Sequence, residues 1–269
     1  MYTAAFRYLR PKTLAEAEAQ FRDAGDAKYL AGGQTLIPTM KQRLAAPSAL
    51  IDIARIPGLA FIRREANALV IGAATPHADV AASPVVRAAI PALAHLAGLI
   101  GDPAVRHKGT IGGSLANNDP AADYPAAVLG LNATIATNKR DIAADRFFTG
   151  LYATALKPGE IITQVAFPLA KRAAYVKFHN PASRFALVGV FVAQSAAGVR
   201  VAVTGAASCV FRVKRMEKAL AENFTPDAVA RIKVAADKLN SDIHAAADYR
   251  AHLITVLAQR AVAAALAGS

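Results

Sequence analysis

Apolar residues return at helical spacing between residues 13 and 24, and this pattern predicts the first helix. Leu14 and Phe21 fall on one face, and Glu16 follows Thr13 by three positions, as in a capping box. Gly25 comes directly afterwards and is a typical stop signal. The start signal, the apolar face and the stop signal therefore all predict the same helix.

Other stretches show either strand or helix patterns. Short apolar runs bounded by turn residues predict strands over 28–31, 49–53, 61–64, 69–73, 133–137, 161–167, 175–178, 187–193 and 199–204. The runs 61–64 and 69–73 are joined near Asn67 and predict a hairpin. Helical spacing returns over 77–82, 84–100, 126–131, 212–222, 227–239 and 248–267. Between 112 and 123 the pattern is polar and predicts a loop.

The order of these elements predicts an α+β fold, because strands and helices do not alternate as regular βαβ units. The segment 168–173 is the predicted junction between two domains. We find no internal repeat and no long low-complexity linker.

Composition narrows the functional classes. The 269 residues are 54% hydrophobic and 19% charged, which excludes a wholly disordered chain. The single cysteine, Cys209, excludes a disulfide framework or an iron–sulfur cluster built by this chain alone, and the histidines show no metal-ligand spacing. The net charge of +12 favours anionic partners such as nucleic acid, phosphorylated cofactors or acidic protein surfaces.

Targeting signals are weak. The first residues lack the apolar run of a signal peptide, and charges and prolines interrupt the alanine-rich stretches before a membrane-spanning length of about 20 residues. We therefore expect a cytoplasmic protein with no membrane span.

Two glycine pairs carry the candidate chemistry. The first, Gly32-Gly33, lies in the run from Leu30 to Ile37, and the second, Gly112-Gly113, lies in the run 110–114. Successive glycines let the backbone expose several N–H groups on one side, and such concave runs bind phosphate. Two such loops would grip a diphosphate from opposite sides.

Each glycine pair on its own is also consistent with an ordinary tight turn. Neither run contains the G-x-G-x-x-G fingerprint of a Rossmann fold or the G-x-x-x-x-G-K-[ST] phosphate loop. A Rossmann fold and a P-loop fold therefore both lack their main sequence signal.

Taken together, the two runs resemble the flavin subunit of the molybdenum hydroxylases, a family that includes the medium subunit of carbon monoxide dehydrogenases and the flavin domain of xanthine dehydrogenases. Further matching segments follow in order over essentially the whole chain. They are Phe6-Arg7-Tyr8, Leu14-Ala15-Glu16-Ala17, Val105-Arg106-His107-Lys108, Pro158-Gly159-Glu160-Ile161-Ile162 and Tyr249-Arg250 with Leu253.

The resemblance implies a fold and a cofactor. The implied fold is a two-part FAD-binding region of the vanillyl-alcohol-oxidase type over 1–170, with parts at about 1–57 and 58–170, followed by a small α+β domain over 171–269. The implied FAD contacts are Leu30, Ala31, Gly32, Gly33, Gln34, Thr35, Leu36, Ile37, Thr110, Ile111, Gly112, Gly113, Ser114, Asp123, Ile161, Ile162, Lys177 and Phe185.

Several of these positions have a structural alternative. Asp123 precedes a predicted helix and is also typical of an N-cap. Lys177 lies in an alternating strand, where lysine is usually solvated, and strand isoleucines such as Ile161 and Ile162 are usually core residues. Two positions depart from the family pattern: Gln34 stands where histidine is frequent, and Phe185 where tyrosine is frequent.

The resemblance implies an electron-transfer subunit of an oxidoreductase and assigns no catalytic residue to this chain. FAD would pass electrons from an iron–sulfur small subunit to an external acceptor, while a molybdenum large subunit oxidises the substrate, in an assembly typical of a dimer of heterotrimers. Molybdenum cofactor and [2Fe-2S] clusters would belong to those partners. A free-standing flavin oxidoreductase is the first alternative. A basic nucleic-acid-binding protein is the second, although no basic run with interleaved aromatic residues supports it.

Overall fold

The first helix, α1 (Leu14–Ala24), forms as its sequence signals predict. In this computed structural model, which describes residues 2–268, the Thr13 hydroxyl accepts a hydrogen bond from the Glu16 amide at 3.1 Å, and Gly25 follows the helix with a φ of 71°. Buried Ala17 packs on a parallel sheet in the order β1-β3-β2. Its strands are β1 (Arg7–Leu9), β2 (Ala27–Leu30) and β3 (Ala49–Asp52), and α2 (Leu36–Lys41) follows the first glycine pair.

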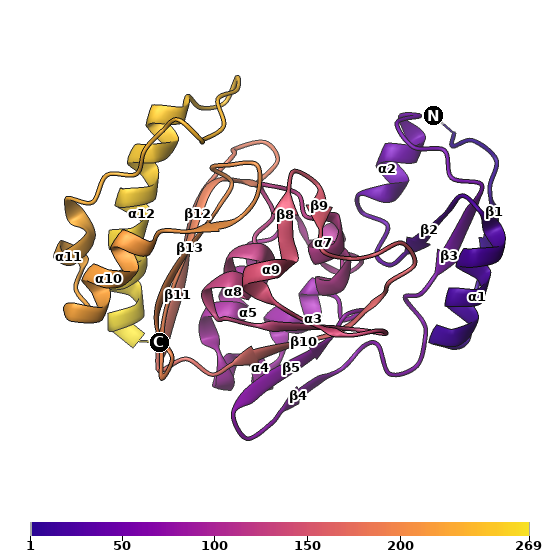
Figure 1. The fold of residues 1–269 in the computed structure, drawn as a ribbon, viewed down its shortest axis with the longest axis horizontal. Coiled ribbons are helices and arrows are strands. Elements are labelled where there is room, and N and C mark those ends of the chain that lie inside the picture. Colours follow the sequence, from indigo (N-terminus) through magenta and orange to yellow (C-terminus); the bar gives the residue numbers. More distant parts are fainter. Residues whose placement is uncertain (1, 269) are drawn as a thin grey trace.

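A five-stranded antiparallel sheet, in the order β4-β5-β10-β6-β7, forms the central region (Figure 1). Its strands are β4 (Ile62–Arg64), β5 (Ala68–Gly72), β6 (Thr134–Thr137), β7 (Asp141–Ala143) and β10 (Ile162–Pro168). Alternate residues such as Leu69, Ile71, Val165 and Phe167 point into one large core, as the period of two in a strand requires.

Short helices pack on this sheet and complete the central region. They are α3 (His77–Ala82), α4 (Pro84–Ala89), α5 (Pro91–Gly98), α6 (Pro103–Arg106), α7 (Ile111–Asn117), α8 (Tyr124–Gly130) and α9 (Ala144–Phe147). A small hairpin of β8 (Phe148–Gly150) and β9 (Ala153–Thr154) precedes the return to β10.

The C-terminal region is an antiparallel sheet with helices on both faces (Figure 1). The strands are β11 (Arg172–His179), β12 (Ala186–Ser195), β13 (Gly198–Thr204) and β14 (Phe211–Arg212), and the outer helices are α10 (Lys214–Glu222), α11 (Pro226–Ala230) and α12 (Ala247–Gly268). Val188, Val190 and Val192 pack in the core under α12, whereas Phe191 and Ala193 join the core of the central region. Because both faces are covered, most of β12 is buried and reads as a continuous apolar run.

Most predicted strands are confirmed, including the hairpin of β4 and β5. Two predicted helices are longer than the helices in the structure. The helix predicted over 84–100 is divided into α4 and α5 at Ile90, because Pro91 lacks an amide proton and restricts the residue before it. The helix predicted over 227–239 ends at Ala230, and Ile232, Val234 and Leu239 instead pack on the core under α12 from irregular backbone.

The α12 helix is the one helix among residues 2–268 that is long and apolar enough to cross a membrane. In this structure Leu253, Ile254 and Leu257 on one of its faces are buried against the C-terminal sheet. Core helices of soluble domains pass the same test of length and composition, so this helix does not indicate a membrane span.

Candidate functional site

A cleft of about 630 Å³ lies where the N-terminal region meets the central region. Its volume is in the range of cofactor sites. Both glycine pairs line it, together with residues of β2, the start of β10 and the segment before β12. The prediction that the two pairs share one cleft is therefore confirmed.

Direct packing joins the two glycine motifs. A Cβ placed on Gly32 would lie 2.1 Å from the carbonyl oxygen of Lys108, so this position accommodates only glycine. A Cβ on Gly113 would lie 3.7 Å from the Ala31 Cβ. Segments about 80 residues apart are thus held in contact at the bottom of the cleft.

The first motif offers unpaired backbone donors. Within the described chain, the amides of residues 32–35 have no hydrogen-bond acceptor, and these four residues all line the cleft. Gly33 has a φ of 71°, which glycine adopts without strain. The hydroxyl of Thr35 is also without an intramolecular partner in residues 2–268. This run has the chemistry of a phosphate cradle.

The second motif works differently from the prediction. It is not a loop: Gly112 and Gly113 lie in the first turn of α7, and Thr110 is the N-cap that accepts from the Gly113 amide at 3.1 Å. The Ile111 amide donates to the Thr75 carbonyl and the Gly112 amide to the Ala73 carbonyl. These amides are therefore already paired, and the glycines serve close packing, since a Cβ on Gly112 would lie 2.6 Å from the Ala73 Cβ.

These observations fit a dinucleotide diphosphate. The free amides of the first motif and the hydroxyls of Thr35 and Ser114 provide hydrogen-bond donors to phosphate oxygens. The second motif supplies the opposite wall at close range. No cluster of three His, Cys, Asp or Glu that could hold a metal ion occurs within residues 2–268.

Asp123 and Lys177 form a buried ion pair beside the cleft. Their charged atoms are 3.0 Å apart, and both side chains are 4% exposed. The Tyr175 hydroxyl donates to Asp123 at 2.5 Å. Burial raises the pKa of Asp123, while Lys177 and Tyr175 oppose that shift. Asp123 does occupy the N-cap position of α8, but its side chain makes no capping hydrogen bond and pairs with Lys177 instead. The alternative of a solvated Lys177 is wrong.

Lys177 also holds the segment that carries Phe185. Its ammonium donates to the carbonyls of Leu99 and Arg184, each at 2.9 Å, so its three N–H bonds all have protein acceptors. Arg184 has a φ of 61°, and Phe185 beside it lines the cleft with 48% of its surface exposed. Lys177 itself does not line the cleft.

His77 also lines the cleft, although no sequence motif pointed to it. Its ring is 5% exposed and packs against Tyr124 and the backbone of Gly109. Burial, reinforced by Arg106, lowers its pKa to about 4, so the imidazole is neutral at pH 7. Its buried Nδ1 has no hydrogen-bond partner within residues 2–268.

The structure brings most of the predicted contacts to the cleft. Those that line it are Leu30, Ala31, Gly32, Gly33, Gln34, Thr35, Leu36, Thr110, Gly112, Gly113, Ser114, Asp123, Ile161, Ile162 and Phe185. Ile37, Ile111 and Lys177 do not line it, because Ile37 packs over Gly33, Ile111 is fully buried and Lys177 is paired with Asp123. Sequence reasoning missed His77, Glu160 and Arg184 as residues lining the cleft.

Comparison with known proteins adds a family and close relatives. Residues 4–170 match the family model described as "FAD binding domain in molybdopterin dehydrogenase". The chain is 37% identical to the carbon monoxide dehydrogenase medium chain of Hydrogenophaga pseudoflava, covering 99% of both proteins. It is 35% identical to the nicotine 6-hydroxylase medium subunit of Paenarthrobacter nicotinovorans, covering 97% of this chain and 98% of that subunit.

A solved structure shows the same fold over the full length. A chain of reconstituted CO dehydrogenase from Oligotropha carboxidovorans superposes with a TM-score of 0.92 at 32% identity, and the alignment covers 100% of both chains. The predicted α+β fold with an FAD-binding region is therefore confirmed.

Proposed function

Because the chain belongs to the family of FAD-binding domains in molybdopterin dehydrogenases, we propose that it is the FAD-carrying electron-transfer subunit of a molybdenum-containing oxidoreductase complex. It would take electrons from iron–sulfur clusters of a small subunit and deliver them to an external acceptor, while a large subunit oxidises the substrate at molybdenum. The shared cleft, lined by the four unpaired amides of the first motif and by the closely packed second motif, is the observation that carries this proposal.

Bound FAD would supply the redox centre, as flavins do in general. The residues of this chain bind and orient it. The amides of residues 32–35 and the hydroxyls of Thr35 and Ser114 would hold the diphosphate, and Phe185 offers an apolar ring surface at the cleft wall. The proposed division of the chain is an FAD-binding region over 1–170, with parts at about 1–57 and 58–170, and a C-terminal domain over 171–269.

The relatives support the existence of partner subunits, and we propose their composition and their cellular setting. The two relatives are medium subunits or chains of larger enzymes, and the names of those enzymes include substrates as different as carbon monoxide and nicotine. We therefore place substrate choice in the molybdenum subunit. The proposed assembly is a dimer of heterotrimers in the cytoplasm, joined to an iron–sulfur small subunit and a molybdenum large subunit.

A flavin-binding measurement tests the proposal. The full-length chain is purified, its visible spectrum recorded, and any released flavin identified by chromatography. We expect one FAD per chain, and weaker binding of FMN because FMN lacks the second phosphate that the first motif would hold. A folded chain that binds no flavin, alone or with its partner subunits, contradicts the proposal.

A further inference from the structure

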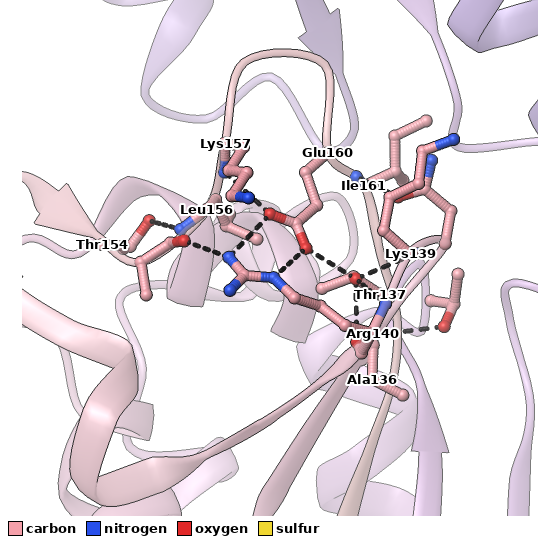
Figure 2. Close-up of polar contacts among 12 residues, drawn as sticks. Ala136, Thr137, Lys139, Arg140, Thr154, Leu156, Lys157, Glu160 and Ile161 are labelled. Atoms are coloured by element: carbon pink, nitrogen blue, oxygen red, sulfur yellow. Dashed lines mark hydrogen bonds and ion pairs between the residues drawn. The ribbon is translucent and has the colours of Figure 1, made fainter.

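Glu160 ends the turn that leads into β10, and its carboxylate is saturated with hydrogen bonds. Figure 2 shows the side chain facing Arg140 and Thr137 from the β6–β7 turn. One oxygen accepts from the Thr137 hydroxyl at 2.8 Å and from Arg140 Nε at 2.9 Å. The other accepts from Arg140 Nη2 at 3.1 Å and from the Lys157 amide at 2.7 Å. The Glu160 side chain is 2% exposed, whereas the Arg140 side chain is 40% exposed, so the carboxylate is shielded from solvent and its guanidinium partner is not.

The same turn also fixes the next residue. The Asn138 amide donates to the Ile161 carbonyl at 2.9 Å, and the Ile161 amide donates to Asn138 Oδ1 at 2.9 Å. Asn138 Nδ2 reaches Glu18 on α1 at 2.6 Å, and Lys139 forms an ion pair with that carboxylate. The β6–β7 turn therefore links α1 of the N-terminal region to the cleft wall at Glu160 and Ile161.

This link lies where the two halves of the cleft are joined. The Ile161 side chain packs in the core of the N-terminal region with Ala27 and Ile51, whereas Ile162 packs in the core of the central region. Both isoleucines and Glu160 line the cleft. This short segment therefore packs on both halves of the cleft and forms part of its wall.

We propose that Glu160 is a positioning residue for the cofactor: with Arg140 and the β6–β7 turn it holds the Ile161–Ile162 wall so that both halves of the cleft contact one FAD. The inference rests on the proposed function. It goes beyond it by assigning a role to a carboxylate that has no free lone pair for the cofactor.

The charge of Glu160 is part of this role. The Arg140 guanidinium, together with the Lys157 amide and the Thr137 hydroxyl, overcomes the effect of burial and lowers the pKa of Glu160 to about 2. A glutamine at this position would direct an NH₂ group toward donors that need an acceptor. The 157–161 turn would then have to move, although the side chain keeps its volume.

Glu160→Gln tests the inference, and Glu217→Gln is its matched control. Glu217 is also buried, accepts from Arg212 Nε and Nη2 at 2.7 and 2.8 Å and from the Val201 amide at 3.2 Å, but does not line the cleft. Both variants should lower the melting temperature. We expect Glu160→Gln to raise the Kd for FAD about tenfold and to change the visible spectrum and fluorescence quenching of bound flavin. Glu217→Gln should leave the Kd for FAD within about twofold of wild type and should leave the flavin spectrum and fluorescence quenching unchanged.

Arg140→Lys keeps the inference testable if Glu160→Gln does not fold. This substitution removes the two hydrogen bonds from the guanidinium to Glu160 but leaves the hydrogen bonds from the Thr137 hydroxyl and the Lys157 amide. We therefore expect a smaller rise in the Kd for FAD than in Glu160→Gln. Unchanged FAD affinity and spectrum in both variants, with wild type binding FAD normally, would overturn the inference and leave the proposed function standing. Failure of the wild type to bind FAD would instead contradict the proposed function.

Discussion

Ile161 and Ile162 are consecutive in the chain, yet their side chains lie in two different hydrophobic cores. The backbone at this point belongs to the N-terminal region on one side and to the central region on the other. Ala73 and Ala74 repeat the arrangement, since Ala73 joins the central core and Ala74 the N-terminal one. All four residues line the cleft, so changes in packing and changes in cofactor affinity are expected to be coupled here.

Gly32→Ala should separate the two glycine motifs. The added Cβ would lie 2.1 Å from the Lys108 carbonyl oxygen and 2.7 Å from the Gly109 Cα, and backbone atoms cannot rotate away. We expect a loss of about 1–3 kcal/mol in the free energy of unfolding. FAD affinity should fall at least about tenfold. Urea denaturation and FAD titration measure the two effects.

Gly98→Ala is the matched control for this substitution. Gly98 lies in α5, and its Cβ would meet only the Ala81 Cβ at 4.0 Å. Alanine favours helix by up to about 1 kcal/mol over glycine, so this variant should be as stable as wild type or more so. Equal FAD binding by Gly32→Ala and Gly98→Ala would contradict the assigned contact between the motifs.

Lys177→Met should destabilise the chain even without flavin. It leaves the Asp123 carboxylate buried without its cation and leaves the carbonyls of Leu99 and Arg184 without a donor. Breaking a buried pair in this way costs about 3–5 kcal/mol, measurable by urea denaturation of the apo chain. Adding Asp123→Asn should recover part of that loss. An apo Lys177→Met chain of normal stability but poor FAD affinity would show that Lys177 contacts the cofactor instead.

His77 should make stability depend on pH between about 4 and 6.5. Its folded pKa of about 4 lies below its ordinary value of 6.5, so between these values the unfolded chain binds a proton that the folded chain does not. The free energy of unfolding therefore falls as pH falls through this window, by roughly 2 kcal/mol between pH 7 and about 5. His77→Leu should remove that part of the dependence in urea denaturation at several pH values. His95→Gln, a change on the exposed face of α5, should follow the wild-type profile.

Asp145 should contribute to the junction between the central and C-terminal regions. This α9 residue pairs with Arg200 on β13 at 2.8 Å and with Arg212 on β14 at 3.2 Å. Because Asp145 is 43% exposed, we expect Asp145→Ala to lower the free energy of unfolding by only about 1 kcal/mol, and by less at high salt. Glu65→Ala breaks a single ion pair with Arg63 in which both side chains are about half exposed, and it should have almost no effect. Similar losses for both variants would argue against a structural role for the Asp145 cluster.

The sequence determined the features that depend on local chemistry. The capping box at Thr13 and Glu16, the hairpin of β4 and β5, and the three long strands of the C-terminal sheet all formed where the pattern predicted them. Of the four motif glycines, only Gly33 has the positive φ that glycine adopts freely, so the sequence indicated this conformation without saying which glycine takes it. The ordered series of motifs was sufficient to indicate the family.

Tertiary structure decided how each motif is used. The two glycine pairs look alike in sequence, yet only the first leaves its amides unpaired, because Ala73 and Thr75 from a distant segment accept those of Ile111 and Gly112. Contacts made by residues far apart in sequence likewise placed Lys177 against Asp123, Leu99 and Arg184 and put Glu160 under Arg140. Hydrogen-bond partners and burial arise only when distant segments meet, so local pattern selects the residue types and packing assigns their roles.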